Sequence, residues 1–140
     1  MKKFIFILFA LIGIAGFSQN ESVTSPKIAI KVALGETISI ENHQIKFVKV
    51  LEDSRCPKDV TCIWAGRARV QIEVSQKEED SLIKELIFGQ VRQGESKDLT
   101  LFSTEDKKVV GISLKPYPTT ENSGSEKEYQ LLVSIEKNEK

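Results

Sequence analysis

Two cysteines, the single tryptophan and several charged side chains lie together in one short stretch of this chain. Thiols at this spacing could form a disulfide, exchange with other thiols or bind a metal, and the indole could serve recognition. The stretch reads Asp53-Ser54-Arg55-Cys56-Pro57-Lys58-Asp59-Val60-Thr61-Cys62-Ile63-Trp64-Ala65-Gly66. Its residue types make it the first candidate for a functional site.

A structural disulfide between Cys56 and Cys62 is the favoured chemistry for the two thiols. Exported chains with an even number of cysteines usually oxidise them. Closing a ring of this size removes about 2.4 kcal/mol of unfolded-state entropy. A redox pair is less favoured, because such pairs usually have two intervening residues and a helix N-terminus. A zinc site would need two more ligands, with only His43 and carboxylates to supply them. We expect a covalent clamp with no metal ion or cofactor.

Trp64 and the charged residues of this stretch each allow two interpretations. The favoured one for Trp64 is a core aromatic packed against the disulfide, because an indole hides a large apolar area. For the charges it is local turn chemistry, with Asp side chains capping amides and an Asp–Arg pair ordering the loop. The alternative is a binding loop formed by Arg55, Lys58, Asp59 and Trp64. A calcium site on Asp53 and Asp59 lacks the dense oxygen-ligand spacing of known loops.

Catalytic motifs are scarce in this sequence. His43 is the single histidine and lies in Glu41-Asn42-His43-Gln44, where we expect a solvated imidazole in a turn between strands. The sequence contains no His-x-x-x-His pair, nucleophile elbow or phosphate-binding glycine loop. Acidic residues are plentiful, so a hydrolase that uses two carboxylates stays open as an alternative. No residue is assigned a catalytic role.

The first eighteen residues predict a secretory signal peptide. Met1-Lys2-Lys3 is positively charged, and Phe4 to Ala15 is almost entirely apolar before the small and polar residues that follow. A membrane-spanning helix needs about 20 apolar residues, and this run is shorter. We place cleavage after Ser18, and no cysteine follows for lipid attachment. The mature chain is expected to be soluble and periplasmic or extracellular, with no membrane span.

Removal of residues 1–18 leaves 122 of the 140 residues, with 18 basic and 20 acidic side chains and a formal net charge of −2. This balance argues against nucleic acid, which usually requires a basic face. It also argues against electrostatic docking on anionic lipid. The expected partner is a protein in the envelope or outside the cell.

Apolar residues alternate with polar ones along most of the mature chain, which predicts strands buried on one side. Five stretches show this period of two clearly: 27–32, 37–41, 67–74, 110–114 and 129–135. In residues 45–51 the alternation changes phase near Phe47-Val48, which indicates a bulge. Residues 81–88 fit either a short helix or a strand buried on both faces, and their neighbours favour a strand.

These strands predict an all-β fold, an antiparallel sandwich or barrel of about 7–8 short strands with one cross-linked loop. We expect a disordered lead over residues 19–26 and a single β domain over residues 27–136. A polar loop is expected at 119–127, and a frayed C-terminus at 137–140.

The segment Asp53-Ser54-Arg55-Cys56-Pro57, followed by Val60-Thr61-Cys62-Ile63-Trp64-Ala65-Gly66, resembles the signature of a group of small exported bacterial proteins of unknown function. Leu114-Lys115-Pro116-Tyr117-Pro118 and the 129–135 strand resemble the end of the same group. The similarity would span most of residues 28–136. It implies an exported β domain, and it brings neither an activity nor catalytic residues.

The sequence therefore favours a non-enzymatic binding or inhibitory module that uses the disulfide-clamped loop 53–66. A rigid loop loses little entropy when it contacts a partner. A purely structural envelope protein and a hydrolase or metal-dependent enzyme with strand-borne carboxylates are the alternatives.

Overall fold

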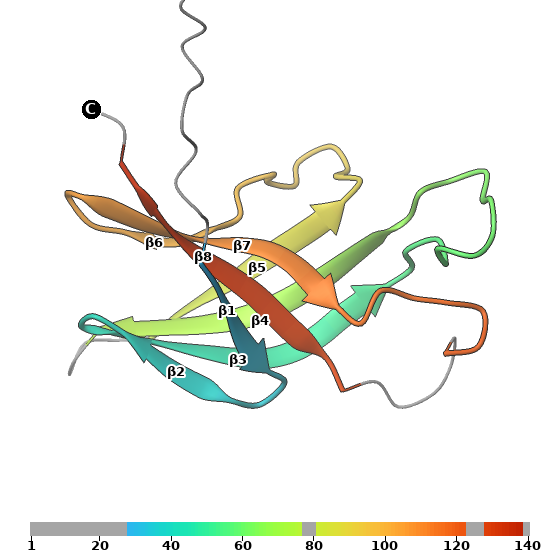
Figure 1. The fold of residues 1–140 in the computed structure, drawn as a ribbon. Coiled ribbons are helices and arrows are strands. Elements are labelled where there is room, and N and C mark those ends of the chain that lie inside the picture. Colours follow the sequence, from blue (N-terminus) through green and yellow to red (C-terminus); the bar gives the residue numbers. More distant parts are fainter. Residues whose placement is uncertain (1–27, 77–80, 123–127, 139–140) are drawn as a thin grey trace, which may run out of the picture.

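The computed structural model describes residues 28–76, 81–122 and 128–138, and the fold in these ranges is all β (Figure 1). Eight strands follow one another along the chain: β1 (Ala29–Ala33), β2 (Thr37–Ile40), β3 (His43–Asp53), β4 (Arg67–Gln76), β5 (Leu82–Gly89), β6 (Thr100–Ser103), β7 (Lys107–Lys115) and β8 (Gln130–Lys137). The predicted fold class is confirmed.

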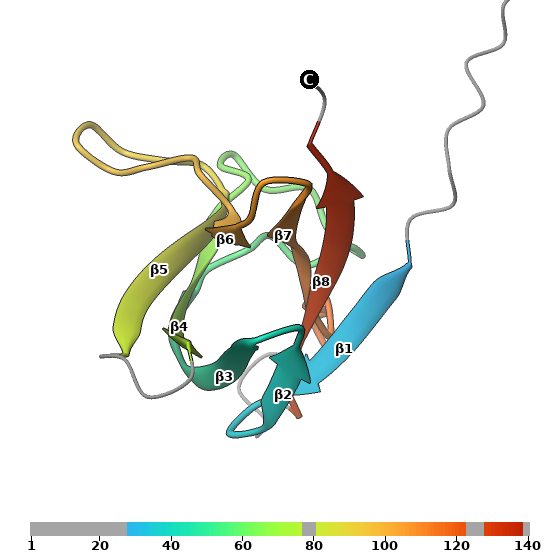
Figure 2. The ribbon, with the colours of Figure 1, turned by 90° about the vertical axis from the view of Figure 1, so that its left-hand side faces the viewer.

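The strands form two four-stranded antiparallel sheets. One has the order β1-β8-β7-β6 and the other the order β2-β3-β4-β5. Viewed along the strands, the two sheets curve around a common interior (Figure 2). The outer strands of the sheets are therefore β1 and β6 in the first, and β2 and β5 in the second.

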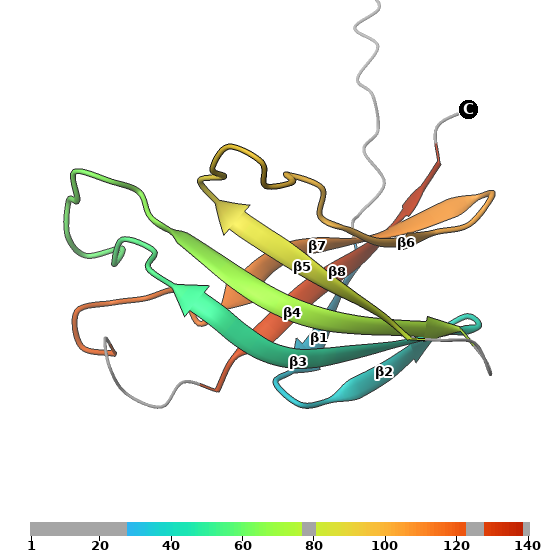
Figure 3. The ribbon, with the colours of Figure 1, turned by 180° about the vertical axis from the view of Figure 1, so that it is seen from behind.

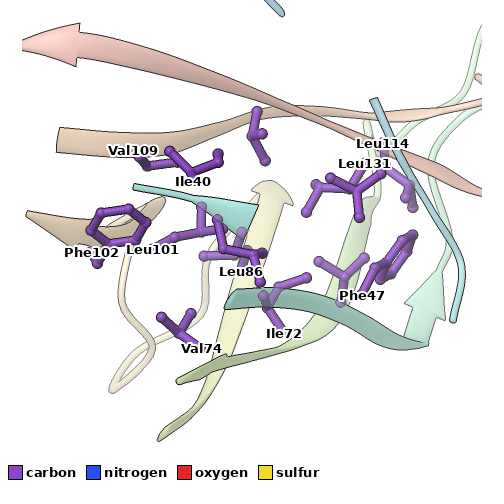
Figure 4. Close-up of a cluster of buried hydrophobic side chains, with 14 of the residues drawn as sticks. Ile40, Phe47, Ile72, Val74, Leu86, Leu101, Phe102, Val109, Leu114 and Leu131 are labelled. Atoms are coloured by element: carbon purple, nitrogen blue, oxygen red, sulfur yellow. The ribbon is translucent and has the colours of Figure 1, made fainter. Parts of the chain in front are cut away.

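The alternation in the sequence places one apolar face of each sheet in the interior. In β4, Ala68, Val70 and Ile72 are fully buried, whereas Arg69 and Gln71 between them are partly exposed. Side chains from both sheets meet in a single cluster (Figure 4). Each fully buried aliphatic or aromatic side chain contributes about 1.5–3 kcal/mol to folding, so this cluster is the main source of stability.

The two stretches that depart from simple alternation are both strands. The register between β3 and β4 shifts between Phe47 and Lys49, which confirms the predicted bulge. The 81–88 segment forms strand β5 (Leu82–Gly89), as its neighbours favoured, and its second apolar doublet, Leu86 and Ile87, is buried. Leu82 and Ile83, the first doublet, are exposed.

Some boundaries differ from the sequence prediction. The strand after the disulfide begins at Arg67, as the alternation over residues 67–74 predicts, but the short strand β6 was not predicted. β8 extends to Lys137, and the Asn138 amide donates to the Asp106 carbonyl at 2.8 Å, so these two residues of the predicted frayed end belong to the paired structure. The predicted signal peptide and disordered lead lie outside the described residues, as do residues 123–127 of the predicted polar loop and residues 139–140.

One end of the molecule carries most of the long connections. β3, β5 and β7 all finish at this end, where loop 54–66, residues 90–99 and residues 116–122 lie near one another (Figures 1 and 3). The cysteine stretch therefore sits on a surface made from three separate parts of the chain.

Candidate functional site

Loop 54–66 connects β3 to β4 and is closed by a disulfide between Cys56 and Cys62, whose Cα atoms are 5.9 Å apart. The predicted disulfide is confirmed. Below the ring, the Ser54 amide donates to the Arg67 carbonyl at 2.8 Å, and the Cys56 amide donates to the Ala65 carbonyl at 3.0 Å. The pairing of β3 with β4 thus continues up to the covalent ring.

Gly66 allows the two sides of the loop to approach each other this closely. Its φ is +68°, and a Cβ added to it would lie 1.8 Å from the Ser54 carbonyl oxygen. Only glycine fits both the left-handed conformation and the contact. The Trp64-Ala65-Gly66 segment therefore ends in a residue that the backbone geometry requires.

Arg55 holds the loop to the opposite sheet from inside the molecule. Its guanidinium forms a bidentate ion pair with Asp53, at 2.7 and 2.9 Å, and both side chains are about 5 % exposed. The same group donates to the carbonyls of Leu114 and Pro116 at 2.6 and 2.9 Å. Asp53 and Arg55 are two positions apart in extended chain, so both side chains point to the same side. The predicted Asp–Arg pair is confirmed, and it also joins β3 to the end of β7.

Two tyrosines complete this buried ionic group. The Tyr129 hydroxyl donates to Asp53 Oδ2 at 2.9 Å, and the Arg55 guanidinium lies 4.9 Å above the centre of the Tyr117 ring. A cation at this distance from an aromatic face is attracted by the ring quadrupole. Asp53 and Arg55 are therefore surrounded by groups that compensate their burial.

Burial, together with the hydrogen bond to Asp53, raises the pKa of Tyr129 from 10.0 to about 12. Since the folded protein keeps this proton more tightly than the unfolded chain, the stabilisation is complete below pH 10 and is lost as the pH rises through 12. We expect the free energy of unfolding to fall in that window by up to about 1.4 kcal/mol per pH unit.

Ultraviolet absorbance titration of the Tyr117→Phe variant isolates the Tyr129 phenolate, because the chain has only two tyrosines. Urea unfolding across the same pH range, compared with Tyr129→Phe, measures the linked stability. Titration of the Tyr129 phenol near pH 10 would contradict the predicted linkage. An equal fall in the unfolding free energy of Tyr129→Phe over this pH range would also contradict it.

Lys58 and Asp59 attach the outer part of the ring to the segment that follows β7. The Lys58 amide donates to the Pro118 carbonyl at 3.0 Å. Asp59 accepts hydrogen bonds from both the amide and the hydroxyl of Thr120, and the hydroxyl bond is the larger cause of its lowered pKa. Asp59 thus caps a backbone amide as predicted, but the amide belongs to Thr120, 61 positions away, and not to the local turn that was expected.

The tip of the loop is apolar and exposed. Trp64 is 72 % exposed and Ile63 is 94 % exposed. The expectation that Trp64 packs against the disulfide is therefore wrong. Trp64 lies two residues beyond the covalent ring, on an exposed part of the connection to β4, and the side chain next to the ring that enters the interior is Arg55.

The four residues of the predicted binding loop divide into two groups. Lys58 and Trp64 are exposed, and Asp59 is exposed but bound to Thr120. Arg55 is only 8 % exposed, so its guanidinium serves the interior and not the loop surface. Ile63 was missed by sequence reasoning, although an isoleucine between a cysteine and a tryptophan, outside any alternating strand, was an available signal.

A second ionic group supports the β4 side of the loop. Arg67 is buried and binds Glu52 at 3.0 Å and Glu95 at 2.6 Å. The backbone amide of Arg92 and the Arg67 side chain lower the pKa of Glu95. These pairs join the connection after β5 to the base of loop 54–66.

His43 differs from its prediction. It is the first residue of β3 and is partly buried, and its ring stacks on Phe102 with centroids 3.9 Å apart. A solvated imidazole was expected because Glu41-Asn42-His43-Gln44 was predicted to be a turn between strands. The stacking places the ring across the two sheets, since Phe102 belongs to β6.

No group of three or more His, Cys, Asp or Glu side chains that could hold a metal ion occurs within residues 28–76, 81–122 and 128–138. In the same ranges no helix is long and apolar enough to cross a membrane. The site is therefore described by its ion pairs, its disulfide and its exposed apolar tip.

Comparison of the chain with protein-family models, with curated proteins and with solved structures gives no match. The resemblance to small exported proteins of unknown function stays a prediction.

Removal of the disulfide tests how much the ring contributes to stability. We expect Cys56→Ser/Cys62→Ser to lose about 2 kcal/mol of unfolding free energy, because the open chain regains loop entropy. Urea unfolding measures the loss, and a reductant should reproduce it in the wild type without changing the variant. An unchanged urea midpoint in the variant would contradict the expected contribution.

Proposed function

We propose that this chain is an exported, non-enzymatic binding module that inserts the tip of loop 54–66 into an apolar pocket of a protein partner. The observation that supports this proposal most strongly is that Trp64 and Ile63 are 72 % and 94 % exposed on a loop that is constrained by a disulfide. Large exposed apolar side chains that lie together often mark interaction sites.

The attachments of the loop support a recognition role. The disulfide, the Arg55 group and the Asp59–Thr120 bonds hold the backbone on both sides of the tip. A loop ordered before contact loses little conformational entropy when it binds. Tryptophan is among the residues most enriched where a few side chains carry most of the binding energy.

The charge around the tip favours a protein over a lipid surface. Lys58 is the basic residue on the exposed part of the ring, and acidic Asp59 follows it directly. Attraction to anionic lipid amounts to about 1 kcal/mol for each basic residue near the surface, so one lysine next to an aspartate gives little. An exposed apolar tip instead fits a concave apolar site on another protein.

The exposed indole separates this proposal from a purely structural envelope protein, for which a shielded Trp64 was the expected feature. The hydrolase alternative gains no support from the acids near the loop. Asp53, Glu52 and Glu95 are all paired with buried arginines. Export itself rests on the predicted signal peptide and on the disulfide, which usually persists in oxidising compartments.

The test compares two double variants of the immobilised protein. Ile63→Ala/Trp64→Ala removes the tip, and Leu82→Ala/Ile83→Ala removes a pair of exposed residues at the start of β5, which are 57 % and 61 % exposed. Extracts of the envelope and the culture medium of the source organism are passed over each, and any protein captured by the wild type is purified and titrated.

The tip variant is expected to weaken binding of the purified partner at least about 30-fold, the effect of losing one hot-spot residue. The β5 variant should bind as the wild type does. Equal binding by both variants, or capture of no protein by the wild type, would overturn the proposal.

A further inference from the structure

A pocket of about 550 Å³ opens beside the loop, between the two sheets. Its walls come from the end of β5, the end of β7, residues 97 and 99 of the connection before β6, and the base of loop 54–66. The volume lies within the range of about 300–1,000 Å³ that is usual for small-molecule sites. The exposed tip residues Ile63 and Trp64 do not line it.

The pocket exists because the pairing of β6 with β7, within the first sheet, stops early on this side. β6 pairs with β7 only as far as Val110, and the Gly111 amide donates to the Leu99 carbonyl at 2.8 Å. Beyond this point, β7 pairs with β8 through Lys115. Among the described residues, no strand pairs with residues 112–115 on the other side, which faces the pocket.

The wall of the pocket is largely apolar. Phe88 and Leu99 are partly buried and pack against the core cluster. Ile112 and Tyr117 are 42 % and 43 % exposed and form the more open part of the wall. An apolar molecule that covered these two side chains would remove their apolar surface from water, which favours its binding.

The charged groups of the wall are all basic. Lys97 and Lys115 are exposed at the pocket, and Arg55 lies deeper, where Asp53 balances its charge. Among the described residues, no aspartate or glutamate lines the pocket. The two lysines are therefore the exposed charged groups of the described wall, beside an apolar surface; Asp98, which follows Lys97, does not line the pocket.

We infer that this pocket binds a small amphipathic carboxylate, with its apolar body against Phe88, Leu99 and Ile112 and its carboxylate at Lys97 and Lys115. This inference does not rest on the proposed protein partner, because the pocket wall contains neither of the tip residues, Ile63 and Trp64. A carboxylate of this kind is ionised at neutral pH, so it complements the lysines.

The probe is decanoate, titrated into the purified oxidised protein below its micelle concentration and followed by calorimetry and by amide NMR shifts. Saturable binding is expected, with the largest shifts at Phe88, Ile112 and Tyr117. Decanol and decyltrimethylammonium have the same chain without the negative charge, and we expect them to bind at least about tenfold more weakly. Absence of saturable decanoate binding, or equal binding of decyltrimethylammonium, would overturn the inference.

Two pairs of matched variants locate the site. Lys97→Gln/Lys115→Gln should raise the decanoate Kd about tenfold, whereas Lys31→Gln/Lys46→Gln, exposed lysines on β1 and β3, should leave it unchanged. Ile112→Trp fills the pocket and should abolish binding, whereas Leu51→Trp replaces a residue with 41 % exposure on β3 and should not.

The loop-tip variant Ile63→Ala/Trp64→Ala should bind decanoate as the wild type does. If it loses decanoate binding while Ile112→Trp retains it, the ligand binds the tip, and the inferred pocket site is wrong. A failure of this inference leaves the proposed partner binding untouched, since that is measured with the tip variant against a protein.

Discussion

Replacement of Arg55 with alanine is expected to lower the free energy of unfolding by about 3–5 kcal/mol. The substitution leaves the Asp53 carboxylate buried without its cation, and its side chain is only 5 % exposed. It also removes the donors to the Leu114 and Pro116 carbonyls. Small domains have about 5–15 kcal/mol of stability in total, so the loss is expected to leave the protein close to unfolding at room temperature.

Arg69→Ala is the matched control for this prediction. Arg69 forms an equally well-aligned pair with Glu85, at 2.5 and 3.0 Å, but both side chains are about one-third exposed. Exposed pairs contribute about 0.2–1 kcal/mol, so the control should remain stable. Urea unfolding at neutral pH measures both variants, and equal losses would show that burial of the Asp53–Arg55 pair does not matter.

The double variant Asp53→Asn/Arg55→Gln separates the ion pair from the packing around it. Removal of both charges leaves no uncompensated buried ion, so the double variant is expected to be more stable than Arg55→Ala. Lower stability of the double variant would mean that hydrogen-bond geometry, and not charge, dominates at this position.

The fold was predictable because burial on one side of a sheet produces an alternation of apolar and polar residues in the sequence. Each strand with strict alternation, such as Arg67–Val74, is a strand in the structure. β6 was missed because it has only four residues, with Leu101 and Phe102 both buried, so it shows no period of two. A short strand next to a bulge is too brief for an alternation to be recognised.

The candidate site was predictable in its location and not in its orientation. The disulfide and the Asp53–Arg55 pair both join residues that are close in sequence, so local chain geometry was enough to predict them. Arg55, however, points inward because its partners are the Leu114 and Pro116 carbonyls, about sixty residues away in sequence. Trp64, two residues beyond the ring, is exposed, and Arg55 is the side chain of this loop that enters the interior. Tertiary contacts of this kind leave no periodic signal.

The substitution of Gly66 with alanine is the second change for which we expect a large loss of stability, about 3–5 kcal/mol. The added Cβ would lie 1.8 Å from the Ser54 carbonyl oxygen and 2.6 Å from its carbon. Both atoms belong to the backbone, so no side-chain rotation relieves the overlap. The two sides of the loop must separate, which breaks the Ser54–Arg67 and Cys56–Ala65 hydrogen bonds below the disulfide.

Gly94→Ala distinguishes this overlap from the cost of a left-handed backbone alone. Gly94 has a φ of +86°, similar to the +68° of Gly66, but an added Cβ there would meet no atom within 4 Å. Its replacement should cost about 1–2 kcal/mol, the penalty of the left-handed conformation. Urea unfolding compares the two variants, and similar losses would mean that the loop opens without breaking its pairing. A larger loss in Gly66→Ala would establish that the close contact of the two loop sides, in addition to the disulfide, holds the exposed tip in place.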